Sequence, residues 1–137
     1  MDRLIVGEKL ESLRRCIERI EARRKDSAEA LARDVDAQDI LSLNLTRAVQ
    51  LCVDVASHVL SDTQQVAPAT MGEAFSRLAD EGLISHELGA RMRAAVGFRN
   101  LAVHAYRDID WGIVQRLTHE GLDDLRAFAR SLAERLG

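Results

Sequence analysis

Residues 99–106 read Arg99-Asn100-Leu101-Ala102-Val103-His104-Ala105-Tyr106, and Arg107 and Asp108 follow directly. Between the polar residues the side chains are small or apolar, and the apolar spacing upstream of them is helical. Ser85 is a suitable N-cap for this segment. The pattern predicts a helix that begins at Ser85 and brings an arginine, a histidine and a tyrosine to its carboxyl end.

Apolar residues recur at spacings of three and four on both sides of this segment, with no strand-like alternation and no internal repeat. The expected helices cover about 2–24, 26–60 (capped by Asp26 or Ser27), 70–82, the segment from Ser85, and a last one capped by Asp108 or Asp110. Residues 61–70 contain the only proline and form the expected long loop. We therefore predict an all-α fold: an up-and-down bundle of four main helices plus one short helix, in a single domain spanning 1–137.

Composition agrees with a globular protein: 137 residues, 47% hydrophobic and 30% charged. No apolar run approaches the ~20 residues that cross a bilayer, and the charged start does not resemble a signal peptide. Cys16 and Cys52 both fall in apolar helical stripes, so we expect reduced core thiols rather than a disulfide or metal pair. The expected location is the cytoplasm, without membrane association.

Charge is distributed unevenly along the chain. The formal net charge is −3, yet between residues 85 and 107 four arginines accompany one glutamate, a local balance of +3. A basic helix on an acidic protein can attract a polyanion such as RNA. Polar residues also recur at helical spacing along the 26–60 segment and form a polar line that includes Asn44 and Arg47. It indicates either a solvent-facing surface or a groove lined for a partner.

The pattern Arg99-x4-His104-x-Tyr106 resembles the signature of the HEPN superfamily as it occurs in HepT-like toxins. These are small all-α ribonucleases paired with a nucleotidyltransferase antitoxin. The stretches 37–48, 75–85 and 96–100 are also similar to the family pattern, in the same order, so the resemblance covers nearly the whole chain.

The resemblance implies a metal-independent endoribonuclease with no cofactor, in which Arg99 and His104 are catalytic. It implies a homodimer that brings two copies of this pair into one cleft, and products with a 2′,3′-cyclic phosphate. Tyr106 corresponds to the residue to which an MntA-type nucleotidyltransferase antitoxin transfers AMP, which neutralises the toxin.

The residue types suit this chemistry. Histidine exchanges protons near neutral pH, and the arginine fork binds two phosphate oxygens. On a continuous helix Arg99 and His104 would lie roughly 140° and about 7.5 Å apart. Asn100, four residues before His104, is placed to orient the imidazole or to contact the phosphate. Arg107 is placed to hold an RNA phosphate or an incoming nucleotide.

Other sites are not indicated. The histidines and cysteines lack zinc spacing, so we predict no metal, and the glycines form neither a P-loop nor a dinucleotide motif. Trp111 is expected to pack within the last helix. One alternative stays open: a catalytically silent helical module that binds and regulates a nucleotidyltransferase or a nucleotide.

Overall fold

The computed structural model describes residues 2–63 and 67–136, which contain helices and no strand. The bounds are α1 Arg3–Arg23, α2 Ala28–Ala32, α3 Val35–Leu60, α4 Met71–Asp80, α5 His86–His104, η1 Tyr106–Asp108, α6 Trp111–Leu117, α7 Glu120–Ala133 and η2 Glu134–Leu136. The predicted all-α bundle is confirmed. No described helix combines the length and apolar character needed to cross a membrane.

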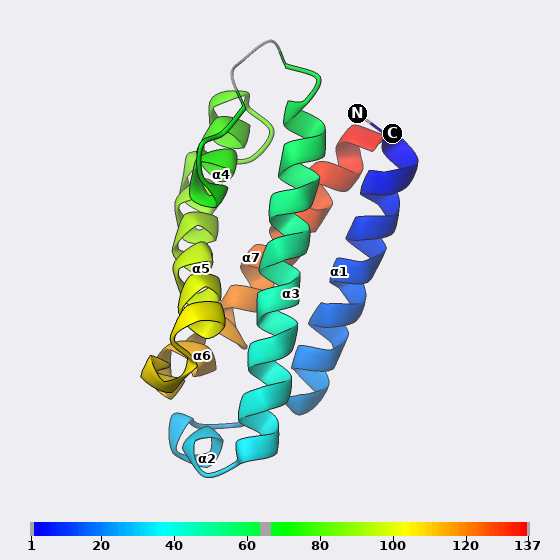
Figure 1. Ribbon diagram of the computed structural model, residues 1–137. Helices are drawn as coiled ribbons and strands as arrows, with labels where there is room; N and C mark the ends of the chain where they lie inside the picture. Colours follow the sequence, from blue (N-terminus) through cyan, green and yellow to red (C-terminus); the bar gives the residue numbers. More distant parts are fainter. Residues whose placement is uncertain (1, 64–66, 137) are drawn as a thin grey trace.

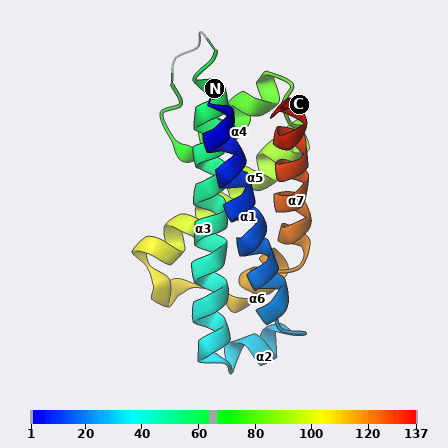
Figure 2. The ribbon, with the colours of Figure 1, turned by 90° about the vertical axis from the view of Figure 1, so that its right-hand side faces the viewer.

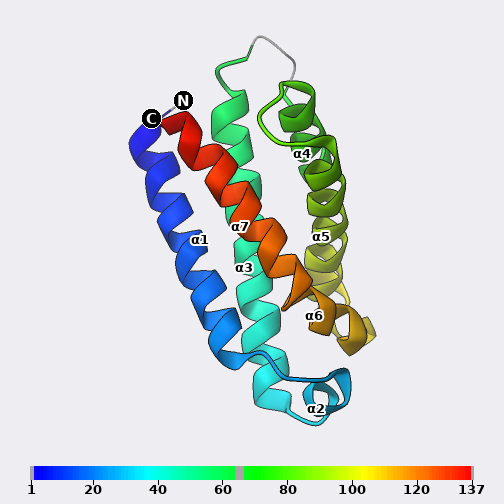
Figure 3. The same ribbon diagram turned by 180° about the vertical axis from the view of Figure 1, so that it is seen from behind.

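The long helix α3 is the centre of the bundle. It packs between α1 and α5, and α7 crosses behind it (Figure 1; Figure 3 shows the reverse side). Seen from the side, α1 lies between α3 and α7 (Figure 2). Half of the residues of α3 are buried, which is the wide apolar face expected of a helix enclosed on several sides. Its remaining exposed strip separates α1 from α5.

Aromatic and backbone contacts hold the outer helices in place. Phe75 of α4 and Phe128 of α7 are buried and meet edge to face, with ring centroids 5.7 Å apart. At the end where α1 begins, Arg3 Nη1 donates to the Leu136 carbonyl at 3.2 Å, so the two chain ends are joined. The bundle is thus closed on its back by α7.

The segment 26–60 is two helices rather than the single helix that the sequence predicted. Ser27 caps α2 as expected, but α2 ends at Ala32 and a second cap begins α3. Asp34 Oδ1 accepts from the Ala37 N–H at 3.0 Å, and Asp34 Oδ2 lies 3.0 Å from Lys25 Nζ. A side chain that satisfies the first amides of a new helix competes with continuation of the old one. The chain therefore turns at Asp34.

The last predicted helix is also two, α6 and α7. Asp110 caps α6 by accepting from the Gly112 N–H at 2.8 Å. The helix is interrupted at Thr118 and His119. Next to this interruption, Gln115 Nε2 donates to the Lys25 carbonyl oxygen at 2.7 Å, and His119 Nε2 lies 2.9 Å from the same oxygen. These contacts fix the break against the α1–α2 connection, on the side of the bundle away from the loop at 61–70.

Of that predicted loop, residues 61–63 and 67–70 are described and 64–66 lie outside the description. Thr70 Oγ1 accepts from the Glu73 N–H at 3.1 Å, and Glu73 accepts from the Ala69 N–H at 2.8 Å. The predicted start of the short helix is therefore confirmed. Gly82, with φ +75°, follows its end, a conformation that glycine adopts without strain.

Candidate active site

Helix α5 carries three of the sequence-predicted site residues, Arg99, Asn100 and His104, and ends at His104. Ser85 Oγ accepts from the Leu88 N–H at 3.0 Å, and the helix continues to His104. At Ala105 the backbone leaves the helical region (φ −148°, ψ 55°), and Tyr106 begins the short helix η1. Arg99 and His104 therefore keep their helical relationship, whereas Tyr106 is placed by a turn and not by continuation of α5.

Arg99 is half-buried near the end of α5. Its Nη1 donates to the Asn100 side-chain oxygen at 3.1 Å, and its Nε is buried without a hydrogen-bond partner among the described residues. Buried unsatisfied donors are uncommon in folded proteins and call for a reason. The contact with Asn100 leaves most of the guanidinium donors free for a ligand.

His104 and Arg107 are exposed on either side of the helix end. In the described part of the chain neither side chain forms a hydrogen bond or ion pair. Asn100 contacts Arg99 rather than His104, so the predicted orientation of the imidazole by Asn100 is not seen in the single chain. The imidazole is accessible to a substrate or to a second chain.

Tyr106 contacts two elements besides its own. Its hydroxyl donates to Asp39 Oδ1 of α3 at 2.7 Å, and its ring meets Trp111 edge to face, with centroids 6.0 Å apart. Burial of the phenol, together with the hydrogen bond to Asp39 and its negative charge, raises the pKa of Tyr106. Tyr106 as a whole is still 39% exposed, so the residue is accessible from solvent. Trp111 packs against the core as well, as predicted.

A shallow hollow of about 280 Å³ lies beside Tyr106, between α3 and α5. Leu43 and Val103, each 50% exposed, are large apolar side chains on its wall. The lining residues are Asp39, Ser42, Leu43, Thr46, Ala102, Val103 and Tyr106. Exposed apolar side chains gathered around a hollow are typical of a contact surface.

Asp39 had not been singled out from the sequence, although it lies within the 37–48 stretch. The sequence showed only that this carboxylate lies in a stretch resembling the family. It did not show that the carboxylate accepts a hydrogen bond from Tyr106. Of the two residues named on the polar line of the 26–60 segment, Asn44 is buried and donates to the Ile40 carbonyl at 2.9 Å. Arg47 is exposed and lies toward α1, in a different groove from Tyr106. Neither joins Arg99 and His104.

Comparison with known proteins finds relatives along most of the chain. The family model "Ribonuclease HepT-like" matches residues 13–132. The mRNA nuclease HepT of Shewanella oneidensis is 32% identical over 124 residues, which cover 90% of this chain and 92% of the relative. The tRNA nuclease HepT of Aphanizomenon flos-aquae is 27% identical over 107 residues, covering 78% of this chain and 73% of the relative.

The structural similarity is equally extensive. A tri-AMPylated HEPN toxin from Shewanella oneidensis, solved in complex with an MNT antitoxin, superposes with a TM-score of 0.88 and 31% identity. The superposition covers 95% of this chain and 97% of that one. With a matching family model over most of its length, and the Arg99-x4-His104-x-Tyr106 pattern where α5 meets η1, this chain belongs to the HepT-like ribonuclease family.

Proposed function

We propose that this protein is the toxin of a HepT/MntA-type toxin–antitoxin system, a metal-independent endoribonuclease that a nucleotidyltransferase antitoxin neutralises. The observation that carries the proposal is the intact Arg99-x4-His104-x-Tyr106 pattern. It lies at an accessible helix end in a chain that matches HepT-like relatives along almost its full length.

In the proposed reaction the 2′-oxygen of a ribose attacks the adjacent phosphorus, and the bond to the 5′-oxygen of the next nucleotide breaks. Histidine accepts the 2′-hydroxyl proton or donates a proton to the leaving oxygen. The Arg99 fork binds the non-bridging oxygens as negative charge develops on them. Asn100, already bonded to Arg99, holds the fork in place, and Arg107 binds a neighbouring phosphate. The products carry a 2′,3′-cyclic phosphate and a free 5′-hydroxyl.

One chain supplies a single histidine to this site, whereas the reaction needs both a base and an acid. A homodimer provides both, because two α5 ends related by a twofold axis place two histidines and two arginines in one cleft. The exposed Leu43 and Val103 beside Tyr106 support a protein contact at this position.

The proposed switch is transfer of AMP to Tyr106 by the antitoxin. The phenol oxygen attacks the α-phosphorus of ATP, pyrophosphate leaves, and the phenol proton is lost. Tyr106 is accessible and lies two residues after His104. A bulky anionic group there would fill the cleft and repel RNA. RNA and the antitoxin are therefore the proposed partners, and one or more AMP units are the proposed modification.

Activity is tested on single-stranded RNA with purified wild type and with His104→Ala and Arg99→Ala. Loss of the acid–base group should lower the cleavage rate roughly 10²–10⁴-fold. His86→Ala is the matched control, because His86 is an exposed histidine at the opposite end of the same helix. Cleavage that survives His104→Ala in a folded protein would refute the catalytic assignment.

The switch is tested by intact mass after co-expression with an MntA-type nucleotidyltransferase. The wild type should gain one or more AMP units, and Tyr106→Phe should gain none. If the wild type binds the transferase tightly, gains no mass and cuts no RNA, the silent regulatory module is the better reading.

A further inference from the structure

A second groove lies on the other side of α3, along its seam with α1. Its volume is about 370 Å³, and the lining residues are Ser12, Arg15, Cys16, Arg19, Arg47, Gln50 and Leu51. The α1 residues recur at spacings of three and four, so they form one continuous helix face. The groove is separate from the hollow at Tyr106 and has no part in the proposed reaction.

Positive charge dominates this groove. Three of its lining side chains are exposed arginines, and none is acidic. Within the described chain, Arg19 and Arg47 form no ion pair. Arg15 approaches a carboxylate only through its Nε, 3.8 Å from Glu11. A protein of formal charge −3 thus holds three largely uncompensated guanidinium groups in one depression.

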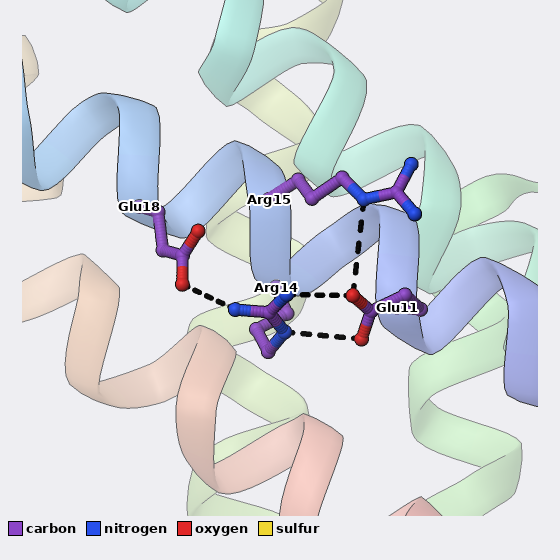
Figure 4. A network of polar contacts seen from close by, with 4 residues as sticks. All are labelled: Glu11, Arg14, Arg15 and Glu18. Atoms are coloured by element: carbon purple, nitrogen blue, oxygen red, sulfur yellow. Dashed lines mark hydrogen bonds and ion pairs between the residues drawn. The ribbon is translucent and has the colours of Figure 1, made fainter.

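The neighbouring Arg14 shows what a neutralised arginine looks like on the same helix. It forms two hydrogen bonds with Glu11, at 2.6 and 3.0 Å, and a further ion pair with Glu18. Figure 4 shows Arg14 between these two carboxylates, whereas Arg15 is joined only to Glu11, by the single long contact of its Nε. The charge in the groove is therefore a property of one face of α1 and is not shared by the whole helix.

The floor of the groove holds a buried thiol. Cys16 is buried there, and burial raises the pKa of its thiol. The positive charges of Arg19 and Arg47 act on that thiol in the opposite direction. Arg19 of α1 and Arg47 of α3 line the groove together with this thiol. Asp54, which accepts a hydrogen bond from the lining residue Gln50 at 3.0 Å, is also paired with Lys9 at 3.4 Å.

The groove and the hollow at Tyr106 lie on the two flanks of the same exposed strip of α3. Leu43 lines the hollow and Arg47 lines the groove, and four residues of helix separate them by about 6 Å. Figure 1 shows α3 running between α5 and α1. The groove therefore begins within one helical turn of the proposed dimer contact, where an RNA strand that leaves the cleft would reach it.

We propose that Arg15, Arg19 and Arg47 form a phosphate-binding groove that holds the RNA backbone next to the cleavage site. Guanidinium forks match phosphate oxygens, and such contacts position a strand without reading its bases. The inference rests on the proposed ribonuclease function, to which it adds a substrate-binding surface outside the Arg99–His104 pattern.

The test measures binding of a fluorescent single-stranded RNA to full-length His104→Ala protein, so that cleavage does not interfere. Arg19→Gln/Arg47→Gln should weaken binding about tenfold at low salt and reduce the slope of log K against log salt by roughly 1.4, about 0.7 for each lost contact. Arg14→Gln/Arg130→Gln is the matched control, because it removes the same charge from exposed arginines outside the groove. Its slope should stay at the parent value. With His104 restored, the groove variant should raise KM and leave kcat unchanged.

The outcomes separate the two proposals. If wild type cleaves RNA and the groove variant matches the control in affinity, slope and KM, the groove inference is wrong and the ribonuclease function stands. If ATP displaces the RNA at lower concentration than unlabelled RNA does, the groove is a nucleotide site instead. Loss of antitoxin binding with unchanged RNA binding would assign it to the protein partner. A wild type that neither binds nor cuts RNA overturns both proposals.

Discussion

The Tyr106 hydroxyl donates a 2.7 Å hydrogen bond to Asp39, a residue 67 positions earlier in the chain. This bond joins η1 to α3 at the point where α5 has just ended. It fixes the phenol beside the hollow and keeps it protonated, because a carboxylate accepts a hydrogen bond from a phenol but repels a phenolate. The residue proposed as the AMP acceptor is thus held in place by a carboxylate of this same chain.

Asp39→Asn should lower the pKa of Tyr106. Burial of the phenol remains in the variant, while the second cause of the raised pKa, the Asp39 hydrogen bond and charge, is removed. Tyr106 is the only tyrosine of the chain, so the ultraviolet absorbance change of tyrosinate reports on it alone. Asp36→Asn removes an equal charge one turn away and should leave the titration midpoint where it is. A midpoint that rises or stays constant in Asp39→Asn would contradict the contact.

Arg99→Lys should lose RNA cleavage although it keeps the positive charge. A lysine is a point charge without the planar fork, and it cannot reproduce two parallel contacts with phosphate oxygens together with the contact to Asn100. We expect a fall in kcat of roughly 10–100-fold. Arg93→Lys, an exposed arginine of α5, is the control and should cleave at the wild-type rate. Equal activity of the two variants would argue for a purely electrostatic role of Arg99.

The sequence predicted correctly the helix starts at which a capping residue follows a loop. Ser85 and Thr70 both cap the helices expected of them. The prediction failed at Asp34 and at Thr118–His119, where apolar spacing continues across a break. There the helix is ended by contacts with Lys25, on a different element. Apolar periodicity indicates which face of a helix is buried. It does not indicate where a side chain will form hydrogen bonds with backbone groups and so end the helix.

The site was predictable to a similar depth. Arg99 and His104 lie on one helix, so their spacing alone gave their relationship. Tyr106 was harder, because its position depends on the turn at Ala105 and on a partner in α3. The groove at Arg47 was visible only as a polar line along α3. Its positive charge arises because Arg15 and Arg19 of α1 lie beside Arg47 of α3, and the sequence does not show that these two helices are in contact.

Cys16 and Cys52 should react with a thiol reagent only when the protein unfolds. Both are buried and free, and burial raises the pKa of each thiol, which disfavours the reactive thiolate. In native buffer we expect labelling at least about tenfold slower than that of free cysteine. In denaturant both thiols should label, and Ser61→Cys, at an exposed position, should supply one fast-reacting thiol in the native state. Fast labelling of the wild type would show that the α1–α3 seam opens readily.

Two glycines of α5 should respond in opposite directions to replacement by alanine. At Gly97 an added Cβ would meet nothing within 4 Å. Gly97→Ala should therefore raise the free energy of unfolding by about 0.5–1 kcal/mol, since it removes backbone freedom from the unfolded chain. At Gly89 the Cβ would lie 3.3 Å from the Phe75 carbonyl oxygen and 3.4 Å from the Ala79 Cβ, both in α4.

The carbonyl of Phe75 belongs to a packed helix and cannot move without displacing α4, so Gly89→Ala should lower the free energy of unfolding by roughly 1–3 kcal/mol. Urea denaturation followed by circular dichroism measures both variants under the same conditions. Because the substitution and the helix are the same, intrinsic helix propensity contributes equally to the two. Stabilisation of both variants would mean that α4 and α5 do not approach closely at Gly89, and the packing that positions the Arg99 end of α5 would then need revision.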